Sequence, residues 1–561
     1  MKNDTKAVPG NRPLDRRKFL VAGLTAVTAL PARQIGWPVP RNFSTLHPQR
    51  HGGAFELEEL TLGQLGEGLR TQQWSSVRLV EIYLARVEEL DRKGATIRHM
   101  LDLNPDAARI AAEFDRERRD GRVRGPLHGI PVVLKDNIDT ADGMTTTAGS
   151  LAMEGSRATR DAPLVTRLRE AGAVILGKTS MSEWANFRSP HSSSGWCSRG
   201  GQGKNPYALD RSPCGSSSGT GGAIAASFAA VGVGTETDGS VTCPASHMAL
   251  VGIKPTVGLI SRRGIIPISA TQDTAGPMAR TVTDAAILLS GLAGADPGDP
   301  ATLQAPAQTD YTRFLELGAL RGKRLGIPRK VFTGYHDGTD RLFEEAVRVL
   351  RDLGAEIIDP TDFSHASDSG AAEFQVLLYE FKAGLNAYLE ARGPATPIRS
   401  LKDLIAFNSR ESQRVMPYFG QETLIEAESK GDLRSAGYRK ALRECGRLWR
   451  REGIDLVMER NRLDALIAPT GNPPWPIDLI NGDHFLGSVT TPAAVAGYPH
   501  VSVPGGWYCG LPVGLSFFGR AWSEGALIGM AFAFEQATRH RRPPAFLPSA
   551  PVETLDGRDG R

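Results

Sequence analysis

The sequence predicts an α/β protein, with helices layered around a largely buried β-sheet. Short apolar runs predict strands at residues 130–134, 173–176, 231–235 and 250–253, and helical segments such as 164–171 and 223–230 lie between them. Strands that alternate with helices are typical of such a fold. The chain has 561 residues, of which 40% are hydrophobic and 23% charged. It is therefore long enough for a large core, and its composition is that of an ordinary globular protein.

The remaining elements follow in chain order from hydrophobic periodicity. Residues 57–119 are predicted to be helical, because apolar side chains recur there at a 3.6-residue period. Residues 300–460 are more polar and more helical, with amphipathic segments at 342–353 and 438–451 and a strand-like run at 324–327. We expect this region to cover one face of the core and to shape access to it. Strand character returns at 465–470 and 511–519, and a closing helix is expected at about 523–539.

The N-terminus has the pattern of an export signal. Residues 15–20 form a twin-arginine pattern, and the apolar run that follows, from Phe19 to Leu30, is too short to span a bilayer. We expect a signal peptide at 1–32, a linker at 33–54, a single domain at 55–545 and a flexible tail at 546–561. The predicted location is periplasmic or secreted, with no membrane association of the mature form. A basic tail with an accidental apolar patch is the alternative.

Charge, histidine and cysteine patterns exclude several classes of partner. The net charge is only +4 and no long Lys/Arg run occurs beyond the N-terminus, so nucleic acid is not expected as a partner. The eleven histidines show no metal-ligand spacing, and we expect no metal and no other cofactor. The five cysteines are expected to be single buried thiols, although export would permit a bridge among three of them: Cys197, Cys214 and Cys243.

Three separated motifs offer a lysine and two serines suited to catalysis. The first motif spans residues 129–137 and includes Lys135. The second is a Gly/Ser-rich loop at residues 214–222. The third spans residues 234–240, in which an Asp-Gly turn directly precedes Ser240. These residues suit nucleophilic acyl chemistry by a Ser-Ser-Lys set. Ser240 is the predicted nucleophile, because a sharp turn after a strand leaves backbone N–H groups free to stabilise an oxyanion. Lys135 must be neutral to act as a base, which requires burial and an Asp136 side chain that points away.

Other interpretations of the Gly/Ser-rich loop fit less well. A flexible linker should not lead directly into a small apolar helix, and the phosphate-loop signature is absent. Residues 215–219 formally match G-x-S-x-G with Ser217 as nucleophile, but that motif needs a buried strand before it, and residues 205–213 contain two prolines. His191 and His247 lie near the motifs, and we expect them to be loop or packing residues.

The three motifs, in this order, resemble the amidase signature family, and within it the bacterial peptide amidases. The similarity covers about residues 57–540 and is strongest at 129–280. It implies an amidase signature fold, a central mixed β-sheet covered by helices on both faces. It also implies Ser240 as nucleophile, Ser216 as bridging serine with a cis peptide geometry, and Lys135 as ultimate base. The oxyanion hole would be formed by backbone N–H groups of four residues: Thr237, Asp238, Gly239 and Ser240.

The resemblance also implies a substrate class. Terminal carboxamides of peptides or amino-acid amides would be hydrolysed with release of ammonia, by a monomer or homodimer. Arylamides, small amides and esters remain alternatives, because the same acyl-enzyme can form from each. Two further alternatives are an amidotransferase A-type subunit, which the export signal disfavours, and a non-catalytic binding protein of the same fold.

Overall fold

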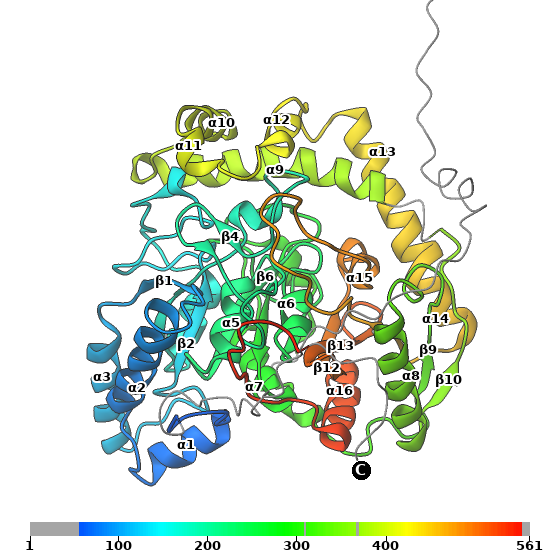
Figure 1. The fold of residues 1–561 in the computed structure, drawn as a ribbon, viewed down its shortest axis with the longest axis horizontal. Helices are drawn as coiled ribbons and strands as arrows, with labels where there is room; N and C mark the ends of the chain where they lie inside the picture. The colour runs from blue at the N-terminus through cyan, green and yellow to red at the C-terminus, as the bar shows by residue number, and fades with distance from the viewer. Residues whose placement is uncertain (1–54, 308–309, 366–369, 552–561) are drawn as a thin grey trace, which may run out of the picture. The chain divides into compact units, whose positions relative to one another are not determined.

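The computed structural model describes residues 55–307, 310–365 and 370–551. The predicted signal peptide at 1–32 and linker at 33–54 lie outside these residues. The chain path is shown in Figure 1.

An eleven-stranded mixed sheet runs through the domain in the order β1-β3-β2-β6-β8-β7-β12-β13-β11-β9-β10. Its strands are β1 (Met100–Leu103), β2 (Pro131–Lys135), β3 (Val174–Thr179), β6 (Val231–Glu236), β7 (Val251–Lys254), β8 (Thr274–Ala279), β9 (Arg324–Gly326), β10 (Glu356–Ile358), β11 (Ala465–Pro469), β12 (His500–Tyr508) and β13 (Leu511–Phe518). β2 pairs in parallel with both β3 and β6, whereas β8, β7, β12 and β13 are antiparallel to their neighbours. A separate two-stranded ribbon consists of β4 (Trp196–Cys197) and β5 (Gly201–Gln202). The predicted mixed sheet is confirmed.

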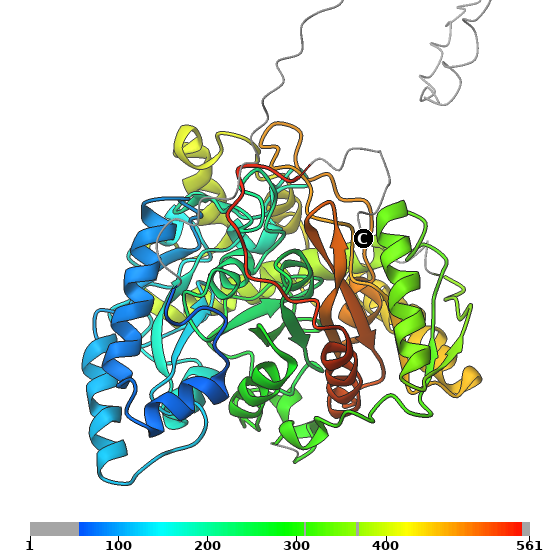
Figure 2. The ribbon, with the colours of Figure 1, turned by 60° about the horizontal axis from the view of Figure 1, so that its bottom comes forward.

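Helices flank this sheet, as the two views in Figures 1 and 2 show. They are α1 (Leu62–Arg70), α2 (Ser76–Val87), α3 (Ala107–Arg119), α4 (Pro163–Glu170), α5 (Ser218–Ala225), α6 (Thr242–His247), α7 (Val282–Leu292), α8 (Asp337–Asp352), α9 (Gly370–Arg392), α10 (Leu401–Arg410), α11 (Ser412–Val415), α12 (Glu422–Glu428), α13 (Ala436–Cys445), α14 (Asp455–Asn461), α15 (Thr490–Ala496) and α16 (Glu524–Thr538). α16 packs against β12 and β13, beside which it lies in Figure 2.

Three predicted boundaries need correction. Strand β1 interrupts the region 57–119 that periodicity predicted to be helical. The helix expected at 223–230 spans Ser218–Ala225 instead, and the left-handed backbone of Ser227 (φ 58°) prevents its continuation. The tail expected at 546–561 packs against the domain at its start, because the Phe546 N–H donates to the Pro206 carbonyl and Ala550 is buried.

Glycine allows α5 to begin close to a neighbouring loop. A Cβ atom on Gly219 would lie 2.2 Å from the carbonyl oxygen of Ser180 and 2.5 Å from its nitrogen. The Gly219 N–H donates to that same carbonyl at 3.0 Å. Because backbone cannot move aside as a flexible side chain can, only glycine fits there. The Gly/Ser-rich loop is therefore fixed against the segment after β3.

The region 300–460 supplies two strands at one edge of the sheet and a layer of helices. β9 and β10 extend one end of the sheet, while α9 to α13 form a helical layer that Figure 1 shows in yellow-green to gold. Leu378, Phe381 and Leu385 on α9 pack in one apolar cluster with Trp184 and Ile268. The more helical region thus covers part of the apolar interior, as expected.

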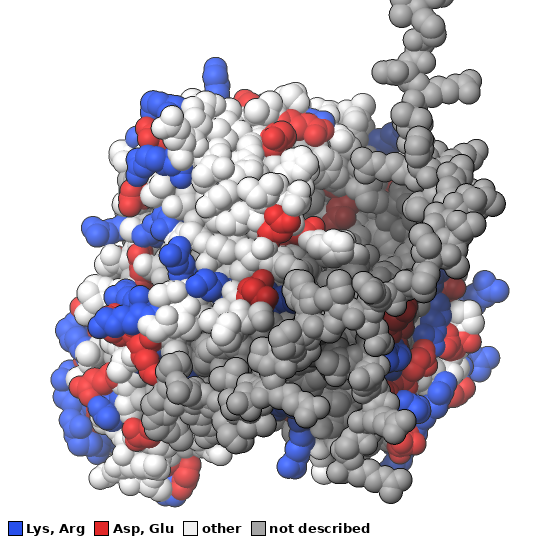
Figure 3. Space-filling model, in the orientation of Figure 1, with Lys and Arg blue, Asp and Glu red and all other residues white. Residues whose placement is uncertain are grey.

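The described surface carries both signs of charge. Figure 3 shows basic and acidic side chains intermixed on the side of α1, α2 and α3, and the pairs there include Arg70 with Glu67 and Arg109 with Glu113. Such interspersed charge differs from the basic stripe typical of nucleic-acid binding. No helix within the described ranges is long and apolar enough to cross a membrane.

Candidate active site

Lys135 ends strand β2 and is completely buried. Its Nζ lies 2.7 Å from Ser216 Oγ and 3.0 Å from the carbonyl oxygen of Thr235, on the neighbouring strand β6. Among the described residues, no carboxylate lies within ion-pair distance of this amine. The structure therefore brings two of the three predicted site residues into direct contact and surrounds the lysine with neutral oxygens.

Burial determines the protonation of this lysine. Removal from water lowers the pKa of Lys135 to about 7, although the carboxylates of Glu236 and Asp273 oppose the shift from a distance. The Asp136 side chain accepts hydrogen bonds from Thr147 Oγ1 and the Gly149 N–H instead. It points away from Lys135, as strand alternation predicted. A neutral amine is thus available close to physiological pH.

The Ser216 loop is tied to the strands and to the Ser240 turn. The Gly215–Ser216 peptide bond is cis, the geometry implied by the family resemblance. The Ser217 N–H donates to the Ser240 carbonyl at 3.0 Å. The Ser217 hydroxyl donates to the Thr235 carbonyl at 3.0 Å and accepts from the Thr235 N–H at 3.1 Å. The loop therefore lies beside the segment that carries Ser240.

Ser240 follows a tight turn at the end of β6. Gly239 has φ +74°, a conformation that favours glycine. Residues 237–240 lie between β6 and α6, outside any helix or strand. Their backbone N–H groups have no hydrogen-bond acceptor among the described residues. Ser240 is 7% exposed, and no hydrogen bond to its hydroxyl is found among the described residues. The turn thus presents free donors next to a free hydroxyl, as an oxyanion hole requires.

Two carboxylates that sequence reasoning assigned no role hold this turn. Glu236 Oε2 accepts the N–H groups of Val241 and Thr242 at 2.8 and 3.0 Å. Asp273 Oδ1 accepts the Thr237 hydroxyl at 2.6 Å. Glu236 lies in segment 235–240 and Asp273 in segment 272–280, and both segments resemble the amidase signature family. That resemblance was the only sequence feature that could have pointed to these two acids. Their contacts depend on the pairing of β6 with β8, which local patterns did not show.

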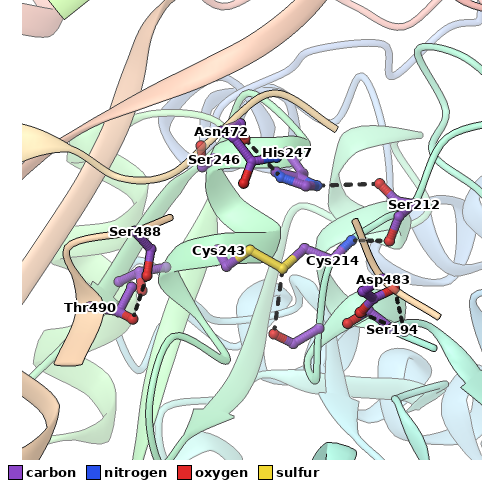
Figure 4. The surroundings of a disulfide bond; sticks show 12 residues. Ser194, Ser212, Cys214, Cys243, Ser246, His247, Asn472, Asp483, Ser488 and Thr490 are labelled. Carbon is purple, nitrogen blue, oxygen red and sulfur yellow. Dashed lines mark hydrogen bonds between the residues drawn. A yellow bond between two sulfur atoms is a disulfide. The ribbon is translucent and has the colours of Figure 1, made fainter. Parts of the chain in front are cut away.

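A disulfide joins the two serine-bearing segments. Cys214 and Cys243 are bonded, with Cα atoms 6.0 Å apart (Figure 4). Cys214 stands two residues before Ser216 and Cys243 three residues after Ser240, so the bridge fixes the separation of the two segments. The expectation of single thiols is therefore wrong for this pair, which the fold brings within bonding distance. Cys197, Cys445 and Cys509 are free.

The nearby histidine has a packing role. His247 is buried, with its ring nitrogens 3.3 Å from the Ser212 carbonyl and 3.2 Å from the Asn472 carbonyl (Figure 4). Its ring also packs edge-on against Trp475. Although His247 lies near the sulfurs of Cys214 and Cys243, the disulfide removes the thiolates that a metal would need. The expected packing role of His247 agrees with these contacts.

The fold and these groups together define an amidase. The chain belongs to the amidase family, since the model described as Amidase matches residues 78–528. It is 51% identical to the native peptide amidase of Stenotrophomonas maltophilia, whose structure superposes with TM-score 0.84 over 88% of this chain and 99% of that one. It is also 42% identical to a probable amidase of Arabidopsis thaliana, over 89% of this chain and 94% of the relative. An A-type subunit of the glutamyl-tRNA(Gln) amidotransferase from Thermoanaerobacter pseudethanolicus is 33% identical, over 87% and 98%.

The disulfide yields a stability prediction. Replacing both Cys214 and Cys243 by serine should lower the free energy of unfolding by about 3–4 kcal/mol, because the bridge closes a loop between residues 29 apart. Urea unfolding of the two proteins measures the difference. Cys509→Ser, at a free and partly exposed thiol, should change stability by less than about 0.5 kcal/mol. Identical unfolding of wild type and double variant under non-reducing conditions would contradict this structural role.

Proposed function

We propose that this amidase hydrolyses C-terminal carboxamides of peptides or of amino-acid amides and releases ammonia. The contact that carries the proposal is the 2.7 Å approach of Lys135 to Ser216, in a segment bridged to the Ser240 turn. The 51% identity to a peptide amidase over nearly its full length supports the substrate class. A structure of the peptide amidase PAM with a competitive inhibitor, chymostatin, is similarly close, with TM-score 0.85.

The proposed reaction is a proton relay with an acyl-enzyme. Neutral Lys135 accepts the Ser216 proton, and Ser216 accepts the proton of Ser240 as Ser240 Oγ bonds to the amide carbon. The N–H groups of residues 237–240 stabilise the negative oxygen that results. The relay returns a proton to the amide nitrogen as the C–N bond breaks and ammonia leaves. Water then attacks the ester, and the relay restores Ser240 as the carboxylic acid leaves.

Substrate binding must complete this relay. The Ser240 hydroxyl makes no hydrogen bond to Ser216 in the described structure, so it has to turn toward Ser216 as the amide carbon approaches. Catalytic hydrogen bonds commonly tighten only in the enzyme–substrate complex. The buried Lys135–Ser216 contact is already in place, and only the more accessible serine needs to move.

Amidotransferase A-type function is the second candidate. The 33% identity to a glutamyl-tRNA(Gln) amidotransferase chain favours it less than the 51% identity favours peptide-amide hydrolysis. Small amides and arylamides would be hydrolysed by the same chemistry as peptide amides. They differ from peptide amides only in the amine that leaves or in the acyl group that is transferred to the serine. Comparison of the hydrolysis rates of each substrate class, measured by release of ammonia or of the arylamine, separates these alternatives.

We also propose export through the twin-arginine pattern at Arg16 and Arg17. A disulfide between Cys214 and Cys243 supports this location, because such bonds persist mainly in oxidising compartments.

The substrate proposal predicts ammonia release from a C-terminally amidated peptide by the purified protein. Ser240→Ala should lower kcat/KM by about 10³-fold or more, because no nucleophile remains. An ammonia assay on both proteins, with the free-acid peptide as control, provides the measurement. Equal rates in the two proteins would place the nucleophile elsewhere. Turnover of an arylamide without turnover of the peptide amide would contradict the substrate class.

The relay predicts a pH dependence set by Lys135. Since only the neutral amine accepts a proton and its pKa lies at about 7, kcat/KM should rise as pH increases through about 7. Lys135→Ala should lose about 10²–10⁴-fold in kcat/KM at pH 8 and lack this rise. Lys93→Ala, at an exposed lysine, is the control. Near wild-type activity of Lys135→Ala at every pH would exclude the relay.

Export predicts that the protein fractionates with the periplasm or the medium. Replacing Arg16 and Arg17 together by lysine should retain it in the cytoplasm, because the twin-arginine pattern is then lost. Immunoblots of cell fractions measure the distribution, and replacement of Arg33 by lysine is the control. Unchanged distribution of the double variant would contradict this route.

A further inference from the structure

A small cavity borders Ser216, the serine whose hydroxyl lies 2.7 Å from the Lys135 amine. Its volume is about 10 Å³, which is about the room that one water molecule needs. Its polar wall comes from the segment after β2 and from the end of β6, and an apolar wall comes from the segment before β8. The lining residues that matter here are Ser216, Asn137, Glu236, Ile265, Ile266 and Ile268.

Asn137 has one hydrogen-bond acceptor that is not used within the protein. Its Nδ2 donates to Thr235 Oγ1 at 3.0 Å and lies 3.5 Å from the Ile266 carbonyl. Since a carbonyl only accepts, the nitrogen of the Asn137 amide, and not its oxygen, faces Ile266. Asn137 is 4% exposed, and its Oδ1 accepts from no donor among the described residues. A buried acceptor without a donor costs free energy, which a donor in the cavity would restore.

Glu236 has a second unused acceptor at the same cavity. Its Oε2 accepts the N–H groups of Val241 and Thr242, whereas its Oε1 is buried and has no donor in the described part of the chain. The residue is 1% exposed. Two side chains with unpartnered oxygens therefore line a space for one small molecule, and the Ser216 side chain lines it as well. The site suits a small molecule that carries several N–H or O–H donors.

The leaving nitrogen of the substrate meets this description. In the relay proposed above, the amide nitrogen receives its proton from Ser216, so it must come within hydrogen-bond distance of Ser216 Oγ. Ser216 is completely buried, and the cavity is open space beside it. When the C–N bond breaks, the nitrogen keeps the electron pair, takes one proton from the relay and departs as ammonia. Its three N–H groups are donors for the oxygens of Asn137 and Glu236.

We propose that this cavity binds the leaving nitrogen, with Asn137 and Glu236 as its acceptors, and that its size restricts the amidase to unsubstituted carboxamides. The inference rests on the amide hydrolysis and the relay proposed above. The water that hydrolyses the acyl-enzyme must give its proton to the same Ser216. By microscopic reversibility it therefore takes the place that ammonia has left, and the cavity has the size for it.

Three isoleucines limit what the cavity can hold. Ile265, Ile266 and Ile268 are 6%, 5% and 6% exposed, so they are packed into the interior and have little room to move. An N-methylamide brings one more carbon atom to the leaving nitrogen, and an arylamide brings a whole ring. One extra methyl group in a packed site typically lowers kcat/KM by about 10- to 200-fold.

The test compares kcat/KM for a peptide carboxamide and for the N-methylamide of the same peptide. Both substrates yield the same free-acid peptide, and chromatography of that product measures both rates. The wild type should prefer the carboxamide by about 10- to 200-fold. The intrinsic reactivities of the two amides are the same for every variant, so a change in this preference reports on the enzyme.

An enlarged cavity should admit the N-methyl group. Ile268→Ala should reduce the preference for the carboxamide about tenfold, because the shortened side chain leaves space beside the nitrogen. Ile398→Ala is the matched control, since Ile398 is 5% exposed and belongs to the same apolar cluster but does not line the cavity. It should leave the preference unchanged. Ile268→Val removes a single methyl group, should change the preference about two- to threefold, and decides the test where the alanine variant does not fold.

Loss of an acceptor should affect the carboxamide alone. Asn137→Leu keeps a similar side-chain size and removes Oδ1, so kcat/KM for the carboxamide should fall about tenfold. The N-methylamide, which its methyl group keeps away from Asn137, should lose less than about threefold. The rise of kcat/KM near pH 7 should remain, because Lys135 and Ser216 are unchanged. A merely structural role of Asn137 would lower both substrates alike.

The outcomes separate this inference from the function it rests on. Absence of carboxamide hydrolysis by the wild type would overturn the proposed function. Hydrolysis of the carboxamide and the N-methylamide at similar rates would overturn the leaving-nitrogen site and leave amide hydrolysis in place. The same preference in the Ile268 variants as in Ile398→Ala, or equal losses of both substrates in Asn137→Leu, would overturn it as well.

Discussion

The burial of the Lys135 amine, with oxygens of a serine and a backbone carbonyl as its nearest partners, is the constraint on which the site depends. An ammonium ion in such a place loses its hydration, and burial favours the neutral amine. The carboxylates of Glu236 and Asp273 keep the shift moderate, so that the amine titrates near neutrality. The sheet supplies this position, because β2 lies between β3 and β6 and its last residue faces the Thr235 carbonyl.

The rest of the site is built by fixing the Ser216 loop against strand β6 and the Ser240 turn. Ser217 binds both the N–H and the carbonyl of Thr235, and its own N–H binds Ser240. The Cys214–Cys243 bridge adds a covalent link outside the two serines. Since the relay needs atoms placed to within fractions of an ångström, such redundant restraints are consistent with pre-organised catalysis. The helical region adds a further brace from α9, through Glu373 and Glu380.

Local patterns predicted much of this arrangement and missed what depends on distant contacts. Lys135 and Asp136 follow an apolar run, so strand alternation alone placed their side chains on opposite sides. Strand β8 escaped prediction because Pro277 stands in it, although it pairs with Val233 of a central strand. Strand β12 is interrupted by Pro504 and two glycines, where its register shifts. The hydrogen bond of Gln272 to Glu373 joins positions far apart in the chain, and no sequence periodicity carries that information.

Neutron crystallography of the deuterium-exchanged protein at pH 8.5 would test the account most directly, by counting the deuterium atoms on Lys135 Nζ. The account predicts two deuterium atoms on Nζ, one of them directed to the Thr235 carbonyl. Three deuterium atoms on Nζ at that pH would show a charged ammonium ion. Lys135 could then not serve as the base, and the proposed relay would be wrong.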